Sequence, residues 1–291
     1  NAISRRGQGP EEYSMMFNAL VDWDKEEVFV FDSASKIVVY SLDGTFKRRL
    51  SFDLHLGQHD AYFWSDSLLI SYQNGNLDKD GNLIPHKPIV LISKTDGKLD
   101  SLSYIKKHDF PTFIGSKQMN IRISWPSLTK LNGDVYVNDV STDTIYHLDA
   151  RTKALQPMMT RTPSVTLDDL DGFLMDLYGI TPQYYFLHFR ARQASMDSHF
   201  MMIDEKSKNA IYDRKDGKVY HPKFSNKDYP SMENCELRFS EEVDACATMQ
   251  IEAFDLIEAL EAGKLSGELK TIAEGLKEDD NPVLMVVKFK E

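Results

Sequence analysis

The sequence predicts an all-β fold made of radially repeated four-stranded units, which is a β-propeller. Three observations predict it. Asp-Gly turn signals recur at a near-constant interval between runs of β-forming residues, a further β-forming run precedes several of them, and no amphipathic helix separates the strands over the first 240 residues. The lack of such helices argues against alternating βαβ units, and short strands at this spacing favour radial repetition over a sandwich.

Four hairpins are predicted from the repeated turn signal. Their β-forming runs end in Asp-Gly or, once, in Asp-Ala, over Ile37–Gly44, Ile89–Gly97, Thr144–Ala150 and Ala210–Gly217. Asp-Gly between two apolar runs favours a tight hairpin because glycine accepts the positive φ angle that such turns require. Gly44, Gly97 and Ala150 are each 53 positions apart, whereas Ala150 and Gly217 are 67 apart, so the longest repeat should contain an insertion.

Another strand is predicted before three of the hairpins, over Val28–Asp32, Ser67–Ser71 and Val135–Asp139. The first and third runs share one order of residues, which places Asp32 and Asp139 at equivalent positions before a polar turn. An aspartate at such a position usually accepts hydrogen bonds from backbone N–H groups and fixes the turn. We expect this structural role for both residues, with ligand binding as the alternative.

Helices are expected only in insertions. Leucine and phenylalanine at mixed spacings of three and four indicate a short helix over Thr166–Gly179, inside the longest repeat. Near the C-terminus two amphipathic patterns separated by Gly263 indicate a helical insertion over residues 251–278 within the last blade. We therefore expect a single β-propeller domain over residues 1–291, with about five recognisable blades.

Composition excludes several classes of partner. The 291 residues carry 34 Lys and Arg against 45 Asp and Glu, a formal net charge of −11, so the chain is a poor partner for nucleic acid or anionic membrane surfaces. No apolar run approaches the roughly 20 residues of a transmembrane helix. Cys235 and Cys246 are expected to be a pair of buried thiols, with a disulfide between them as the alternative.

Motifs near both ends resemble those of a known family. The residues concerned are Gly7-Gln8-Gly9-Pro10-Glu11-Glu12-Tyr13, Val21-Asp22, Val28–Asp32, and the ending Asp279–Leu284 with Lys288-Phe289-Lys290. They are similar to the bacterial six-bladed β-propeller proteins of NHL-like type, in which a Gly-x-Gly-Pro segment links one blade to the next. The resemblance covers essentially the whole chain.

The resemblance implies a secreted, often lipid-anchored protein in the periplasm or on the outer-membrane surface. In that family a complete first blade precedes the Gly-Pro segment, whereas here only Asn1 to Arg6 precede it. The expectation is therefore a six-bladed family type whose first blade is missing or incomplete. The lipid anchor would belong to the same absent N-terminal segment.

The strongest candidate for a ligand-binding strand is the run from Tyr184 to Arg192. Alternation along a strand places Tyr184, His188, Arg190 and Arg192 on one face, and burying these charges unpaired would be costly. That face should therefore border solvent or line a polar channel suited to an anionic or sugar-like ligand. Trp64 and Trp125 lie near loop boundaries and could stack on a sugar ring, with packing between blades as the alternative.

No catalytic motif is present, so the predicted function is an extracytoplasmic binding or scaffold protein for an unknown glycan or protein partner. The alternative is a sugar-directed hydrolase or lyase with its site at the propeller channel. No cofactor is predicted, and a structural or channel-bound divalent cation is left open. His55 and His59 have the spacing of a metal pair, but their surroundings are typical of a strand end or loop.

Overall fold

The computed structural model describes residues 5–32, 36–51, 61–73, 87–102, 113–114, 121–122, 128–139, 142–164, 172–191, 193–196, 202–203, 208–232, 237–239 and 246–289. The chain forms two compact units. The first consists of Asn1–Lys130, Asp134–Leu174 and Ala191–Glu205. The second consists of Leu131–Gly133, Met175–Arg190 and Lys206–Glu291.

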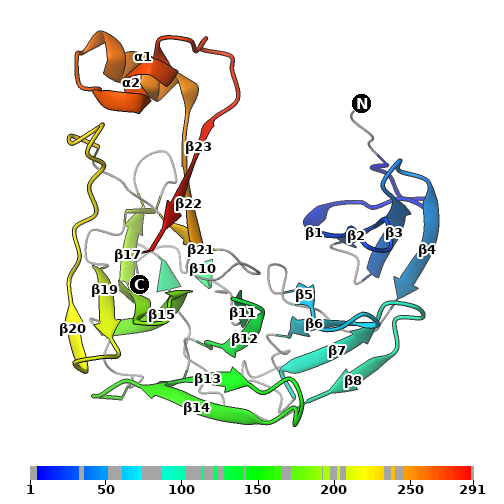
Figure 1. Ribbon diagram of the computed structural model, residues 1–291. Coiled ribbons are helices and arrows are strands. Elements are labelled where there is room, and N and C mark those ends of the chain that lie inside the picture. Colours follow the sequence, from blue (N-terminus) through cyan, green and yellow to red (C-terminus); the bar gives the residue numbers. More distant parts are fainter. Residues whose placement is uncertain are drawn as a thin grey trace. The chain divides into compact units, whose positions relative to one another are not determined.

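Three four-stranded antiparallel sheets form most of the first unit, each with its strands in chain order (Figure 1). The first comprises β1 (Met16–Asp22), β2 (Glu27–Asp32), β3 (Lys36–Ser41) and β4 (Phe46–Ser51). The second comprises β5 (Ala61–Phe63), β6 (Leu68–Tyr72), β7 (Ile89–Ser93) and β8 (Leu99–Ser101). The third comprises β11 (Leu128–Leu131), β12 (Asp134–Val137), β13 (Thr144–Leu148) and β14 (Leu155–Thr160).

A small mixed sheet also belongs to the first unit. Its strands follow the order β10-β9-β17-β18, and β17 runs parallel to β9. They are β9 (Phe113–Ile114), β10 (Ile121–Arg122), β17 (Gln193–Met196) and β18 (Met202–Ile203).

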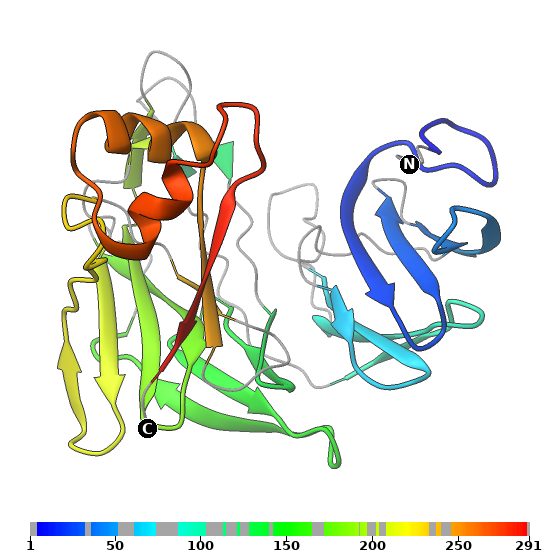
Figure 2. The ribbon, with the colours of Figure 1, turned by 45° about the horizontal axis from the view of Figure 1, so that its top comes forward.

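Two sheets and both helices form most of the second unit. A four-stranded antiparallel sheet contains β15 (Phe173–Ile180), β16 (Tyr184–Ala191), β19 (Lys208–Asp213) and β20 (Lys218–Tyr220). A three-stranded sheet contains β21 (Arg238–Phe239), β22 (Cys246–Ile251) and β23 (Val283–Lys288). Between β22 and β23 the chain forms α1 (Ala253–Glu261) and α2 (Gly267–Ala273), which lie beside one end of these strands (Figure 2).

Neighbouring blades of the first unit pack face to face. Phe29 and Phe31 of β2 belong to one buried cluster with Leu69 of β6 and with Val90 and Ile92 of β7. Alternation along β2 turns the intervening Val30 to the opposite face, where a separate cluster forms. Burying both faces of a strand explains why these strands read as continuous apolar runs in the sequence.

The repeated hairpins use their aspartates as well as their glycines. Gly44, Gly97 and Gly217 have positive φ angles of 84°, 73° and 70°, as the turn signal predicts. In each hairpin the carboxylate also accepts a backbone N–H from two residues further on, at 2.9–3.1 Å, in the pairs Asp43–Thr45, Asp96–Lys98, Asp149–Arg151 and Asp216–Lys218. Because this bond does not need glycine, the hairpin with Ala150 still forms, and its positive φ angle of 56° falls on Lys153.

Asp32 and Asp139 are both buried and hydrogen-bonded, as expected of structural aspartates, and each has a partner that is distant in sequence. The Asp32 carboxylate accepts the backbone N–H groups of Ser14 and Met15 at 3.0 and 3.1 Å and the Ser14 hydroxyl at 2.6 Å. Asp139 accepts the hydroxyl of Tyr72, which lies on the preceding blade. These aspartates therefore join separate segments of the first unit instead of closing only their own turns.

The Gly-x-Gly-Pro segment forms a compact loop around the Glu12 carboxylate, which accepts the Gly9 N–H at 2.8 Å. A Cβ atom on Gly7 would lie 1.9 Å from Glu12 Oε2, so a larger residue there would require the Glu12 carboxylate to move. Tyr40 on β3 donates its hydroxyl to the Glu11 carbonyl at 2.8 Å, which fixes the loop on the first blade. The motif thus has a structural explanation within residues 7–13.

The structure confirms an all-β β-propeller fold with two helices between β22 and β23. It shows five blades among the described residues, so the six-bladed count is not confirmed. The single domain over residues 1–291 stays a prediction. The expected helix over Thr166–Gly179 is wrong where it can be compared, because Phe173–Ile180 is strand β15. Its apolar spacing also suits a strand, and antiparallel pairing within the sheet of β15, β16, β19 and β20 decides between the two.

Candidate ligand cavity

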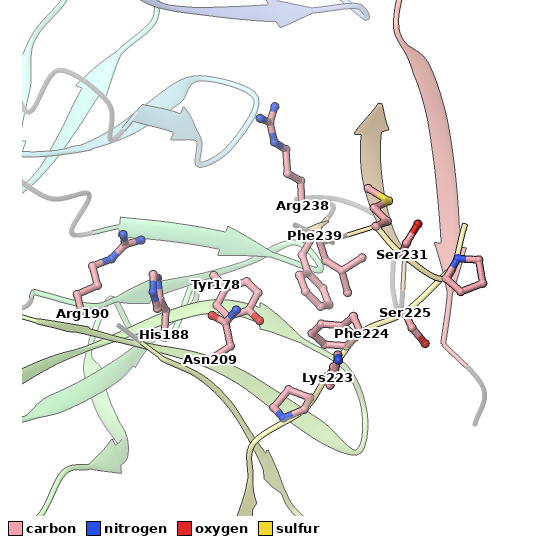
Figure 3. Close-up of a pocket in the computed structure, with 14 residues that line it drawn as sticks. Tyr178, His188, Arg190, Asn209, Lys223, Phe224, Ser225, Ser231, Arg238 and Phe239 are labelled. Atoms are coloured by element: carbon pink, nitrogen blue, oxygen red, sulfur yellow. The ribbon is translucent and has the colours of Figure 1, made fainter. Parts of the chain in front are cut away.

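One face of strand β16 carries polar side chains towards its end and an aromatic side chain before them. His188 and Arg190 line a cavity near its end, as Figure 3 shows. Phe186, two residues before His188 on the same face, is 1% exposed. On the opposite face, Tyr185 stacks on Tyr212 of β19 with ring centroids 5.9 Å apart. The alternation predicted for this strand is therefore observed.

An aromatic cluster around Phe186 packs next to the cavity. The ring of Phe186 lies 6.1 Å from Tyr178, 6.4 Å from Phe224, 4.5 Å from Phe239 and 5.3 Å from Phe289, measured between ring centroids. These residues come from β15, β16, β21 and the segments after β20 and β23. Because three of Phe186's partners are far away in sequence, the cluster holds the two sheets of the second unit together.

Gly179 on β15 leaves the space that Phe239 occupies. A Cβ atom at this position would lie 2.3 Å from two carbon atoms of the Phe239 ring. Any larger residue would force the ring to move, and real Cβ atoms do not approach carbon so closely. The absence of a side chain at Gly179 is therefore part of how β21 reaches the cavity.

The cavity itself has a volume of about 1060 Å³, and the described residues that line it belong to the second unit. Fourteen of the described residues line it, namely Tyr178, His188, Arg190, Asn209, Pro222, Lys223, Phe224, Ser225, Pro230, Ser231, Met232, Leu237, Arg238 and Phe239. Its size is at the upper end of the range found for small-molecule sites. It can therefore accommodate more than a single small ion.

Cations dominate the charge of the described lining. Arg190, Lys223 and Arg238 are joined by His188, and none of the described lining residues is Asp or Glu. This contrasts with the net charge of −11 for the whole chain. A cavity with clustered positive charge in an acidic protein focuses anions on that site.

Arg190 is held in place by Asp176, which is not one of the described lining residues. Asp176 on β15 accepts hydrogen bonds from Arg190 Nε at 3.1 Å and from Nη2 at 2.9 Å, both on the same carboxylate oxygen, Oδ2. The contact fixes the orientation of Arg190 while its charge stays at the cavity.

His188 lies opposite Asn209 in the antiparallel pairing of β16 with β19. Directly opposed residues have Cβ atoms roughly 4.5–5.5 Å apart, so their side chains are neighbours on the cavity face. In Figure 3, Asn209 and Tyr178 lie next to His188, with Arg190 beyond it. This end of the cavity therefore combines an imidazole, an amide, a phenol and a guanidinium.

The wall opposite β16 is a segment without regular structure, Pro222 to Met232, and the helices hold it. The carbonyl of Asp228 accepts the Ser266 N–H at 2.8 Å, and its carboxylate accepts the Glu268 N–H at 3.1 Å. Tyr229 and Met232 pack on the core that α1 and α2 share with β22 and β23. The helical insertion therefore braces one wall of the cavity.

Replacing Asp228 with alanine should loosen this wall. The change removes the acceptor at the start of α2, and loss of such a cap costs about 1 kcal/mol of unfolding free energy. We expect faster amide hydrogen exchange across residues 222–232 and at the start of α2, measured by mass spectrometry. The matched control is Asp279→Ala, an exposed aspartate in a turn of the same unit. Equal exchange in the two variants would show that Asp228 does not hold the wall.

The residues predicted to bind a ligand do not all lie at this cavity. His188 and Arg190 line the cavity together, whereas Tyr184, on the same strand, contacts the Phe186 ring at 6.4 Å and does not line it. Trp64 belongs to the first unit, where it packs against the core between the second and third blades. Arg192 and Trp125 lie outside the described residues. Their roles in ligand binding stay predictions.

Sequence reasoning did not identify Lys223, Phe224, Arg238 or Phe239. These residues lie in or beside short segments between strands, where no periodic pattern marks a face. A usable signal was Pro222-Lys223-Phe224, a proline-containing segment after a hairpin that mixes a cation with an aromatic residue. Such segments between strands often carry binding residues.

No three His, Cys, Asp or Glu side chains gather as metal ligands among the residues that the structure describes. His55, His59 and Cys235 lie outside that part of the chain. Cys246 is half-buried on β22 as a free thiol. Neither described helix is long and apolar enough to cross a membrane.

A family model described as a domain of unknown function, DUF4934, matches residues 1–288. No curated protein matches the sequence. Among solved structures, a Bacteroides fragilis protein assigned to the exported proteins superposes with a TM-score of 0.64 at 16% identity. That alignment covers 99% of this chain and 81% of the other. This likeness shows the fold.

Two further solved structures are similar over part of the chain. One is an auxiliary nutrient binding protein from Bacteroides ovatus, with a TM-score of 0.38 at 11% identity over 72% of this chain and 41% of that one. The other is BamB from Moraxella catarrhalis, with a TM-score of 0.36 at 13% identity over 69% and 47% of the two chains. Scores this low carry no argument about function.

Proposed function

This chain belongs to the DUF4934 family of domains of unknown function, and we propose that it is an extracytoplasmic binding protein that takes an anionic ligand in the cavity of its second unit. The observation that carries the proposal is the charge of the lining, with three basic side chains and a histidine and, among the described lining residues, no carboxylate. These side chains attract an anion that enters the cavity.

Arg190 is the residue we expect to contribute most to anion binding. It is half-buried, with 24% of its side chain exposed, and Asp176 fixes its direction. Because Arg190 is bound to Asp176, the informative variant replaces both, Asp176→Asn with Arg190→Gln. Hydrogen bonds to charged groups contribute about 1.5–3 kcal/mol, which predicts an affinity loss of roughly tenfold to a hundredfold for an anion.

The test compares anions with neutral molecules of the same shape by isothermal titration calorimetry. Phenylacetate is paired with phenylacetamide, and glucuronate with glucose. We expect only the anions to bind, more weakly as salt is raised, and more weakly still to the double variant. The control is Arg214→Gln, which removes a cation of the same unit that lies over Tyr185 and outside the lining. Equal affinity for neutral and charged members would overturn the proposal.

The alternative function, a sugar-directed hydrolase or lyase, has less support from this cavity. Hydrolysis of a glycosidic bond usually needs two carboxyl groups, and the described lining offers none. A lyase would need a base, for which His188 is the candidate. Incubation with a uronate polymer distinguishes the two functions: a lyase would release an unsaturated product that absorbs in the ultraviolet, a hydrolase would release new reducing ends, and a binding protein would release neither.

Export and anchoring are part of the same proposal. They rest on the resemblance of the Gly-Pro segment and the C-terminal motif to secreted β-propellers, and the similar Bacteroides fragilis protein is also assigned to the exported class. Whether the ring has six blades and whether a lipid anchors the protein are proposals of the same origin. Fractionation of cells that express the full-length gene, with labelled palmitate as the lipid probe, tests both location and anchoring.

A further inference from the structure

The basic residues of the cavity come from three separate elements. Arg190 is on β16, Lys223 follows β20, and Arg238 is on β21. In Figure 3, Arg190 and Arg238 lie apart, with Tyr178 near His188 and Phe239 below Arg238 in that view. A ligand with several acidic groups could contact more than one of these positions. The distribution therefore suits a ligand that carries several acidic groups along its length.

Aromatic rings line the same cavity as these basic residues. Tyr178 and Phe239 belong to the cluster around Phe186, and Phe224 lines the cavity from the wall segment. Aromatic side chains bind ligands with flat apolar surfaces, and a sugar ring offers such a surface on its C–H face. The lining thus combines positive charge with apolar ring surface.

Neutral polar groups complete the lining. Asn209, Ser225 and Ser231 each offer both donors and acceptors, and none of them carries a charge. Groups that can reverse their hydrogen-bonding role suit hydroxyl groups, which do the same. A compact anion such as phosphate would use neither these groups nor the aromatic rings.

From this arrangement we infer that the ligand is an acidic oligosaccharide of at least two uronate residues, which spans from Arg190 to Arg238 across the aromatic rings. This inference rests on the proposed function and names the class of ligand for the same cavity. The volume of about 1060 Å³ is large enough for such a chain. The helical insertion, which braces the wall, would then keep Phe224 at the ligand.

Calorimetry with uronate oligomers of defined length tests the inference. The probes are mono-, di-, tri- and tetragalacturonate, the same lengths of oligomannuronate, and fully methyl-esterified trigalacturonate. Affinity should rise from the monomer to the trimer and fall on esterification, which removes the charge and keeps the rings. Arg238→Gln should weaken the trimer about fivefold and the monomer less, since an exposed pair contributes up to about 1 kcal/mol. Arg214→Gln serves again as the matched control.

The outcomes separate the inference from the proposed function. If single organic anions bind through Arg190 but no uronate oligomer binds more tightly than its monomer, the saccharide class is wrong and the anion site stands. If hexaglutamate binds as tightly as the trimer, the partner is an acidic peptide and the inference is overturned. If no anion binds at all, the proposed function fails with it.

Discussion

Replacing Phe186 with alanine is expected to lower the free energy of unfolding by about 3–5 kcal/mol, the range for deleting a buried aromatic ring. Phe186 is 1% exposed and contacts the rings of Tyr178, Phe224, Phe239 and Phe289. The cavity left behind would be lined by rings that cannot all collapse into it, because they come from separate elements. Urea unfolding followed by circular dichroism measures the change.

Phe186→Leu is the matched control, because it keeps an apolar side chain in the cluster. We expect it to cost substantially less than the alanine change. The alanine variant should also bind anions more weakly, because Phe186 supports the strand that carries His188 and Arg190. A loss below 1 kcal/mol for Phe186→Ala would show that this cluster does not organise the second unit.

Replacing Asp32 with asparagine is expected to cost about 3 kcal/mol, which is typical of breaking a buried hydrogen-bonded ion pair. Its side chain is fully buried, accepts bonds from Ser14 and Met15, and lies 3.2 Å from Lys36 Nζ. An amide would direct its own N–H group towards these donors. The exposed Asp24→Asn is the control, and it should leave stability unchanged.

The contribution of Asp32 to the free energy of unfolding should decrease as the pH is lowered. Burial alone would raise the pKa of this carboxyl, but the bonds from Ser14, Met15 and Lys36 outweigh burial and hold the pKa well below its usual range. Its contribution is therefore complete above the unfolded pKa of about 3.9 and is lost as the pH falls below it. Unfolding from pH 7 to pH 2 should show the wild type losing its advantage over Asp32→Asn. A constant difference across this range would contradict the assignment.

Glu27 contributes to acid sensitivity in the same direction. Arg48 binds its carboxylate with two nitrogens at 2.7 and 2.8 Å, which lowers the pKa of Glu27 to about 2 despite burial. Arg48 also donates to the carbonyl of Lys94, which pairs with Asp22 at 2.9 Å. These contacts join the first two blades, so acid should separate blade from blade in the first unit before it melts the strands themselves.

Local features of the sequence were enough to predict the blades. The hairpins depend on Asp-Gly turns and on alternation over a few residues, and both act within a single repeat. The same local reasoning failed at Phe173–Ile180, because leucine spacing there fits a helix and a strand equally well. Only pairing within the sheet of β15, β16, β19 and β20, which involves residues outside the window, decides the outcome.

Only some residues of the candidate site could be predicted from the sequence. His188 and Arg190 were identified because two charged groups on an apolar strand violate the usual pattern of burial. Arg238 and Lys223 look like ordinary surface cations in the sequence, and they become part of a site only when β21 and the wall segment meet β16. The role of Gly179 could not be predicted, since the space it leaves is filled by the ring of Phe239, sixty positions later in the sequence.

The pairing of β22 with β23 is uninterrupted from Cys246 opposite Lys288 to Ile251 opposite Val283, although both helices separate the strands in sequence. The entropy of closing a loop grows only with the logarithm of its length, by about 0.6 kcal/mol for each doubling. The join between Ile251 and Val283 can therefore accept segments of very different size without loss of the sheet. Since the present segment braces the cavity wall, exchanging it is a route by which evolution, or an engineer, can change the shape of the cavity and leave every strand intact.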